Sequence, residues 1–195
     1  MLGLKLPTDP RWARIAEEKT EDVLTDHAFC EQKAASTAIS LIVQYPEYSE
    51  LVHAMADLAR EEMEHFQRVH AIIRERGWVL GKERRDAYVN ELAGFIRKGE
   101  GRMVALIDRL LFAALIEARS CERFKLLSEV LEDEELKAFY RELMISEAGH
   151  YTLFLGFARK YGTPEGMDVD ARWQEFLSFE AAVIARYGKS EHIHG

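Results

Sequence analysis

Residues 51–69 read LVHAMADLAREEMEHFQRV, and the spacing within this stretch decides the fold class of the chain. Its apolar residues recur every three or four positions, as from Leu51 to Met55, which is the period of one face of an α-helix. Glu62 and His65 lie on that same face, so the helix would turn a carboxylate and an imidazole towards the protein interior. A buried carboxylate is costly unless it is paired, which makes this helix a candidate for metal binding as well as for packing.

The rest of the chain repeats this helical pattern and predicts an all-α protein. Only 4 prolines and 12 glycines interrupt the 195 residues. We expect long helices over about 21–44, 48–76, 102–131 and 133–161, a short amphipathic piece near 85–97 and a last short helix near 170–187. Two hairpins joined by a long crossover segment form the ferritin-like version of the four-helix bundle. The predicted organisation is a single ferritin-like domain over 1–195, with an irregular lead-in over 1–20, the core bundle at about 21–161 and a flexible tail at about 188–195.

Composition excludes several classes of protein. Hydrophobic residues make up 48% of the chain, but no run of about 18 apolar residues predicts a membrane span. Residues 1–12 lack the pattern of a secretory signal, and the two cysteines, Cys30 and Cys121, are expected to be free thiols in a reducing cytosol. A net charge of −8 argues against a general nucleic-acid binder, although it leaves room for a local basic surface. The expected location is therefore cytoplasmic.

Two Glu-x-x-His motifs, Glu62-Met-Glu-His65 and Glu147-Ala-Gly-His150, lie near the middle of long predicted helices. Residues three apart on a helix point to one side, so the two side chains of each motif can hold one ion together. The sequence contains four such motifs, where composition alone gives roughly one. Those at 50–53 and 191–194 have no supporting context and match that background.

An internal repeat distinguishes the other two motifs. Glu31 precedes Glu62 by 31 residues. Glu117 precedes Glu147 by 30 residues, in the same arrangement. Stacked hairpins would bring these side chains to one level, as in ferritin-like di-iron and di-manganese proteins. The predicted metal ligands are the four glutamates and two histidines of the repeat: Glu31, Glu62, His65, Glu117, Glu147 and His150. Glu122 is an alternative to Glu117, which we prefer because it preserves the spacing and lies on a small apolar stripe.

The ligand types indicate the metal. Mixed oxygen and nitrogen ligands favour iron or manganese over zinc, calcium or magnesium, and two divalent cations would neutralise four carboxylates. The alternative is that these residues are surface charges that pair with lysine or arginine on solvated helix faces. Three neighbouring residues, His27, Cys30 and Cys121, are open to two interpretations, as packed core residues or as part of the metal environment.

The symmetric pair of motifs narrows the classes of protein. Iron-storage ferritins usually lack the second histidine, so an oxygenase, a desaturase or a manganese catalase fits better than a storage cage. The sequence has no Cys-x-x-Cys pair, which argues against a rubrerythrin. Radical-generating reductase subunits are much longer chains. An iron-binding or structural helical bundle without turnover is a further alternative, from another class.

Four segments carry a resemblance to a known family: residues 26–35, 59–66, 118–124 and 146–151, which read DHAFCEQKAA, AREEMEHF, ARSCERF and SEAGHY. They resemble the ligand-bearing stretches of the tRNA hydroxylases that act on 2-methylthio-isopentenyladenosine, and the resemblance covers most of the chain. The six predicted ligands fall where the di-iron ligands of that family would. The resemblance implies a non-haem di-iron monooxygenase that hydroxylates the isopentenyl group at position 37 of tRNA, next to the anticodon. Another ferritin-like di-iron oxidase, or a manganese catalase acting on a small molecule, is the alternative.

The resemblance also implies cofactors and partners: two iron ions, O2 as co-substrate, tRNA and an electron-donating reductase, but neither a membrane nor DNA. The modified base would swing out of its loop to reach a buried site. An acidic protein needs local basic residues to bind RNA phosphates. The candidates are basic residues of the crossover segment and of the helix that follows it: Lys82, Arg84, Arg85, Arg97, Lys98, Arg102, Arg109, Arg119 and Arg123.

Overall fold

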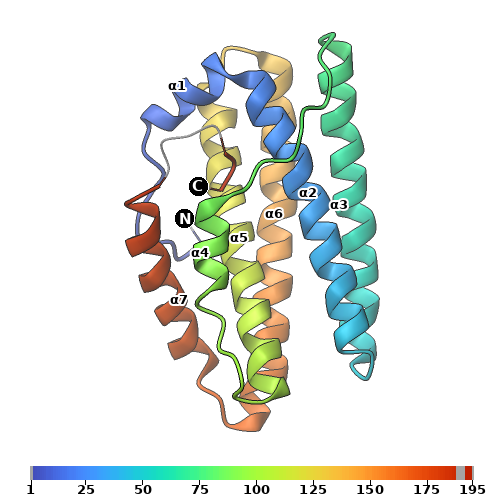
Figure 1. Ribbon diagram of the computed structural model, residues 1–195, viewed down its shortest axis with the longest axis vertical. Helices are drawn as coiled ribbons and strands as arrows, with labels where there is room; N and C mark the ends of the chain where they lie inside the picture. Colours follow the sequence, from blue (N-terminus) through green and yellow to red (C-terminus); the bar gives the residue numbers. More distant parts are fainter. Residues whose placement is uncertain (1, 188–191, 195) are drawn as a thin grey trace. The chain divides into compact units, whose positions relative to one another are not determined.

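The computed structural model describes residues 2–187 and 192–194, and every regular element in these residues is helical (Figure 1). The elements are α1 (Arg11–Glu18), α2 (Thr20–Gln44), α3 (Ser49–Glu75), α4 (Ala87–Ala93), α5 (Arg102–Val130), α6 (Glu134–Gly162), the 3₁₀ turn η1 (Thr163–Glu165) and α7 (Val169–Ile184). The four predicted long helices are all present, with ends within one residue of the expected positions. The all-α class is thereby confirmed.

The internal contacts of the chain divide it into two compact units. Among the described residues, the α2–α3 unit comprises 18–85 with His192 and Ile193. The α5–α6 unit comprises 2–17, 86–187 and His194. Each unit is built around one helical hairpin, and the single domain over 1–195 stays a prediction.

The α2–α3 unit is an antiparallel pair of long helices, blue and teal in Figure 1. Pro46 lies in the short connection between them, and because proline cannot continue a helix, α2 ends at Gln44 as predicted. Leu24 and Met55 are fully buried in the apolar stripes of the two helices. After α3, Gly77 adopts a φ of +75°, which glycine takes without steric cost, so it stops the helix where the sequence predicts.

The α5–α6 unit contains the second hairpin together with α1, α4 and α7 (Figure 1). Aspartate side chains begin three of its helices: Asp86, Asp133 and Asp168 each accept a hydrogen bond from a backbone N–H in the first turn of α4, α6 or α7. At the end of α6, a Cβ on Gly162 would lie 2.6 Å from a methyl carbon of Val169 and 3.2 Å from Ile107. The close approach of α7 to the hairpin therefore requires glycine there.

The lead-in over 1–20 is more regular than predicted, because it contains α1. Trp12 and Ala16 of this helix are buried, with 0% and 2% exposure. The helix directly follows Pro10 and has only 8 residues, and a stretch of that length is too short to show a helical period in the sequence. Tertiary packing of the Trp12 ring stabilises it instead.

The predicted flexible tail is only partly within the structure. Residues 188–191 and 195 lie outside the described residues, and with them the glutamate of the 191–194 motif. Ile193 and His194 are buried, with 0% and 6% exposure, so the expectation of a loose tail is wrong for these two residues. The reason is polar as well as apolar, because the backbone N–H of Ile193 donates to Asp26 at 2.7 Å.

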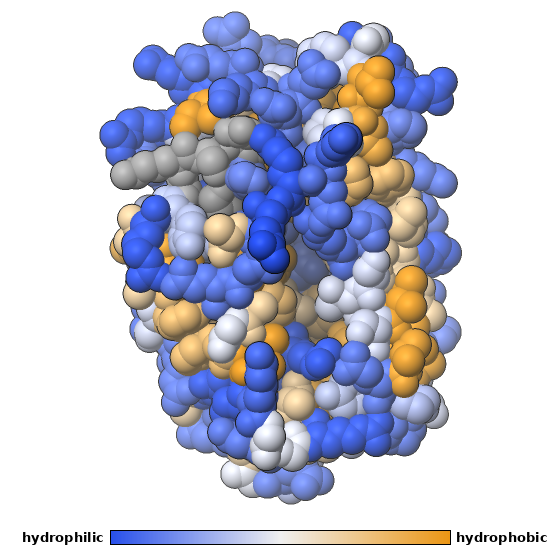
Figure 2. All heavy atoms as spheres, viewed as in Figure 1, coloured by the Kyte–Doolittle hydropathy of each residue, from blue (hydrophilic) through white to orange (hydrophobic). Residues whose placement is uncertain are grey.

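The face drawn in Figure 2 is mostly hydrophilic, with separate apolar spots. The large apolar residues that are most exposed, Val43, Val79 and Ile145, lie on different elements of the chain. In the described part of the chain, no helix combines the length and the apolar content that a membrane crossing needs.

Candidate metal centre

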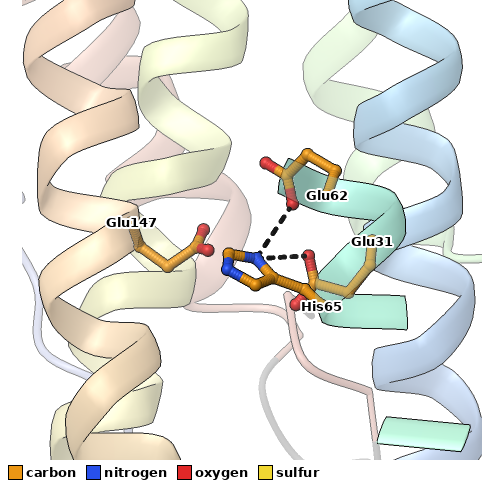
Figure 3. Close-up of side chains that lie close together, drawn as sticks. All are labelled: Glu31, Glu62, His65 and Glu147. Carbon is orange, nitrogen blue, oxygen red and sulfur yellow. Dashed lines mark ion pairs between the residues drawn. The ribbon is translucent and has the colours of Figure 1, made fainter. Parts of the chain in front are cut away.

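The α2–α3 unit brings together three of the predicted ligands, Glu31 from α2 and Glu62 and His65 from α3, which we call the first half-site (Figure 3). One ligand atom from each residue lies within 4.8 Å of the others. The His65 Nδ1 atom is 3.4 Å from Glu62 Oε2 and 3.9 Å from Glu31 Oε2. All three residues are buried, with 4%, 0% and 5% exposure for Glu31, Glu62 and His65.

The α5–α6 unit brings together the other three predicted ligands, Glu117 from α5 and Glu147 and His150 from α6, which form the second half-site. Again one ligand atom from each residue lies within 4.8 Å of the others. The distance from His150 Nδ1 to Glu147 Oε1 is 3.8 Å. All three side chains are buried to a similar degree, so each half-site repeats the other in residue types, spacing and burial.

Glu117 and Glu122, the two candidates for the same ligand position, lie in different surroundings. Glu122 accepts hydrogen bonds from the backbone N–H of Thr8 at 2.9 Å and from Arg119 Nη1 at 2.8 Å. Its carboxylate therefore faces the N-terminal segment of the α5–α6 unit. Glu117 lies with Glu147 and His150, as the repeat spacing predicts.

Each half-site suits a divalent cation by the chemistry of its donors. Two carboxylates and one imidazole bring two negative charges to a buried position, which is unfavourable without a counter-charge. One divalent ion per half-site balances those charges, and the oxygen and nitrogen donors match iron or manganese. The residues present therefore fit the metal that the sequence predicts.

Two polar contacts lie next to the half-sites, one in each unit. In the α2–α3 unit, the His27 Nε2–H group donates to Glu31 Oε1 at 2.6 Å, one helical turn away. In the α5–α6 unit, Ser120 Oγ and His194 Nε2 are 2.8 Å apart, one turn beyond Glu117. From the sequence, His27 is open to two interpretations, as a packed core residue or as part of the metal environment, and its contact with Glu31 favours the second. Ser120 and His194 are 74 residues apart, so the sequence gives no local signal for their contact.

The thiol of Cys121 is buried in the α5–α6 unit and donates to the Met144 carbonyl at 3.2 Å. Burial, with the negative charges of Glu117 and Glu122, raises the pKa of this thiol to about 11. A thiol with such a pKa stays protonated at neutral pH and is a poor nucleophile. Cys121 is therefore a packed core residue, and Cys30 is a second free thiol that is half-buried.

The basic residues predicted to bind RNA differ in their exposure. In the α2–α3 unit, Lys82 and Arg85 are exposed, and Arg84 donates to the carbonyl of Asp22 at 3.2 Å. In the α5–α6 unit, Lys98 and Arg102 are exposed and Arg109 is half-buried. Arg97 donates through Nη2 to the buried Asp108 at 2.8 Å, so its guanidinium is already engaged within the protein.

The prediction that Arg119 and Arg123 contact RNA is wrong. Both side chains are fully buried, so neither is available to an RNA phosphate. Arg119 Nη2 donates to Glu180 at 2.5 Å and to the Leu6 carbonyl at 3.0 Å. Burial disfavours its charged form, but Glu180 and the other negative groups around it raise the pKa of Arg119 above its ordinary value. The guanidinium of Arg123 stacks on the Trp12 ring at 4.4 Å from the ring centroid.

Known proteins match this chain over most of its length. A solved structure described as Protein 43 with aldehyde deformylating oxygenase activity, from Synechococcus, matches with a TM-score of 0.89 and 35% identity, covering 98% of this chain and 95% of that chain. This likeness confirms the ferritin-like fold class.

Two curated relatives are named tRNA 2-(methylsulfanyl)-N(6)-isopentenyladenosine(37) hydroxylase. The one from Pseudomonas putida is 43% identical over 159 residues, which are 82% of this chain and 76% of that protein. The one from Salmonella typhimurium is 29% identical over 240 aligned positions, covering 98% of this chain and 87% of that protein. The family model described as tRNA-(MS[2]IO[6]A)-hydroxylase (MiaE) matches residues 2–195. The repeated half-sites, the fold and these matches agree, and the chain belongs to the tRNA-(MS[2]IO[6]A)-hydroxylase (MiaE) family.

Proposed function

We propose that this protein is a cytoplasmic tRNA hydroxylase, which adds oxygen to the isopentenyl group of 2-(methylsulfanyl)-N6-isopentenyladenosine at position 37 with a di-iron centre and O2. The observation that carries the proposal is the pair of like half-sites, one in each helical hairpin, each buried and each with two glutamates and one histidine. Family membership and the names of both curated relatives support the substrate.

The metal centre we propose joins the two half-sites. Each half-site carries two negative charges, so two divalent cations neutralise the set of four carboxylates and two imidazoles. The ferritin-like fold supports this, since proteins of this architecture place one glutamate and one Glu-x-x-His motif from each hairpin around two metals. The ligands would be Glu31, Glu62, His65, Glu117, Glu147 and His150.

In the proposed reaction the chain supplies the metal ligands, keeps water out of the site and binds the RNA. When bound, a pair of iron ions supplies the activation of O2 that insertion of oxygen into an unactivated C–H bond requires. Two small apolar residues of α5, Ala113 and Ala114, are buried within four residues of Glu117. An apolar, water-poor surrounding protects a reactive site from side reactions.

The balance of the reaction requires an electron donor. One oxygen atom of O2 enters the substrate C–H bond, and the other leaves as water after taking up two electrons and two protons. The cysteines cannot supply these electrons over repeated turnovers without an external reductant, since each is a free thiol. We therefore propose a separate reductase as partner.

The RNA-binding surface we propose is limited to basic residues that the structure leaves exposed. In the α2–α3 unit these are Lys82 and Arg85, and in the α5–α6 unit they are Lys98 and Arg102. Arg119 and Arg123 are left out because they are buried. The adenosine must leave the stacked anticodon loop to reach buried ligands, which costs a few kcal/mol at most in a single-stranded loop.

A second candidate function is oxidation of a small aldehyde. It is favoured by the structural match to a protein with aldehyde deformylating oxygenase activity. The two candidates share a metal centre and differ in substrate, so substrate assays with one preparation separate them.

The deciding experiment supplies the iron-loaded protein with a reductant, O2 and tRNA that carries the modified base, followed by mass analysis of the nucleosides. We expect one added oxygen atom in the isopentenyl nucleoside. Glu147→Ala should abolish the product while helicity is kept, and the matched control Glu142→Ala, an exposed glutamate of the same helix, should leave it unchanged. If no oxygen is added to the tRNA nucleoside and an aliphatic aldehyde is consumed, the second candidate is favoured and the first is refuted.

A further inference from the structure

The two half-sites differ at the residue one helical turn before the first glutamate. His27 lies four residues before Glu31 on α2, whereas Ala113 lies four residues before Glu117 on α5. We propose that His27 is a positioning residue, which holds the Glu31 carboxylate for metal binding and makes the two metal positions unequal in affinity. This inference rests on the metal centre of the proposed function.

The contact that carries the inference is short and completely internal to the α2–α3 unit. His27 Nε2 lies 2.6 Å from Glu31 Oε1, and the two side chains have exposures of 0% and 5%. Residues at i and i+4 of a helix lie one above the other, so the contact needs no distortion of α2. A hydrogen bond to a carboxylate in a buried position is stronger than one in water, because the surroundings screen it poorly.

The two oxygens of Glu31 have different neighbours as a result. Oε1 accepts the hydrogen bond from His27, and Oε2 faces the half-site, 3.9 Å from His65 Nδ1. His27 therefore fixes the rotation of the carboxylate so that one defined oxygen faces the other donors. Orientation of a ligand by a hydrogen bond from a neighbouring side chain is the usual way in which proteins tune a metal site.

The second half-site cannot use the same device. The methyl group of Ala113 has no N–H to donate, so the contact that His27 makes on α2 has no counterpart at the equivalent position of α5. The internal repeat is thus broken at one position that touches a predicted ligand. We expect the metal ion of the first half-site to be held more tightly than that of the second.

The test is a titration of the metal-free, full-length protein with Co(II), whose d–d absorption reports the ligand geometry of each ion. Wild type should bind two ions per chain with distinct affinities. In His27→Leu, which keeps the volume and removes the donor, one of the two affinities should fall by about 10–100-fold and part of the absorption band should shift. His27→Gln, whose amide N–H can replace Nε2–H, should restore most of the affinity.

Controls separate positioning from simple packing. His53→Leu removes an exposed histidine of the same unit, outside the half-site, and should leave both Co(II) affinities unchanged. Thermal unfolding of the metal-free variants reports any packing loss. Should His27→Leu fail to fold, His27→Asn, whose amide is too short to reach Glu31, replaces it in the comparison with His27→Gln.

The outcomes are distinct for the inference and for the function on which it rests. Wild-type Co(II) affinities and an unchanged band in His27→Leu, with or without a lower melting temperature, would overturn the positioning role and leave the metal centre intact. Failure of wild type itself to bind Co(II) would overturn the metal centre, and the inference with it. A loss in His27→Leu that His27→Gln does not restore would also count against a hydrogen-bonding role.

Discussion

Arg119 on α5 and Glu180 on α7 form an ion pair in which both side chains are completely buried, with Nη2 and Oε1 2.5 Å apart. Tyr88 of α4 donates to the same Glu180 oxygen at 2.8 Å. This network ties α4, α5 and α7 together within the α5–α6 unit. It explains why an arginine that the sequence offers as an RNA contact has a structural role instead.

Removing the Arg119 side chain should destabilise the protein strongly, because it leaves the Glu180 carboxylate buried without its cation. Loss of one partner of a buried ion pair costs about 3–5 kcal/mol. We expect Arg119→Ala to lower the free energy of unfolding by that amount in urea denaturation. The matched control Arg141→Ala, at an exposed position of α6, should change it by less than about 0.5 kcal/mol. Equal effects of the two substitutions would contradict the buried network.

Asp108 should contribute to stability in a pH-dependent way. Burial alone would raise the pKa of its carboxyl group, but hydrogen bonds from Arg172 and Arg97 hold the pKa below the ordinary value of 3.8. Since the folded-state pKa is depressed, the stabilisation is present at pH values above about 4 and is lost as the pH falls through the folded-state pKa. Asp108→Asn should therefore be less stable than wild type at pH 7, and the difference should shrink below pH 4. A difference independent of pH would show that the charge of Asp108 has no such role.

The two cysteines should react at very different rates with iodoacetamide. A pKa of about 11 gives Cys121 roughly a hundredfold less thiolate at neutral pH than a thiol at its ordinary value of 9.0. Cys30 is half-buried and should be alkylated first. Mass spectrometry of the native protein should show one rapid modification, which Cys30→Ser removes. Fast labelling of Cys121 without denaturant would contradict its packing.

Binding of tRNA should depend on the exposed basic residues and on salt. Lys82→Ala and Arg85→Ala should each weaken binding, and each should reduce the slope of log K against log salt by about 1 if it contacts a phosphate. Arg60→Ala is the matched control, since Arg60 is an exposed arginine of α3 that pairs with Asp57 and Glu64. Unchanged affinity and slope in both crossover variants would place the RNA elsewhere.

The periodic parts of the fold could be predicted from the sequence, and the reason is local. The ends of α2 and α6 are marked by Pro46 and by Gly162, and the helices between such breaks carry a clear apolar period. The internal repeat predicts the two groups of candidate ligands. Within each hairpin the members of one group lie close in space: Glu31, Glu62 and His65 in the first, and Glu117, Glu147 and His150 in the second.

What the sequence could not reveal depends on contacts between distant segments. Arginine is exposed in most proteins, so the burial of Arg119 follows only from Glu180, 61 residues away, and from the carbonyl of Leu6. The docking of Ile193 on Asp26 spans 167 residues and has no local signal. Helix α1 is too short to be recognised by its period, and its place is set by the Trp12 ring against Arg123.

The decisive measurement for the proposed metal centre is the iron content of the purified protein. We expect two iron ions per chain, and the proposed joint centre predicts that Mössbauer spectroscopy shows them as a coupled pair. Glu62→Ala and Glu147→Ala, one substitution in each half-site, should each lower the iron content. Two uncoupled ions, or no bound iron or manganese after reconstitution, would contradict a joint metal centre built from the two hairpins.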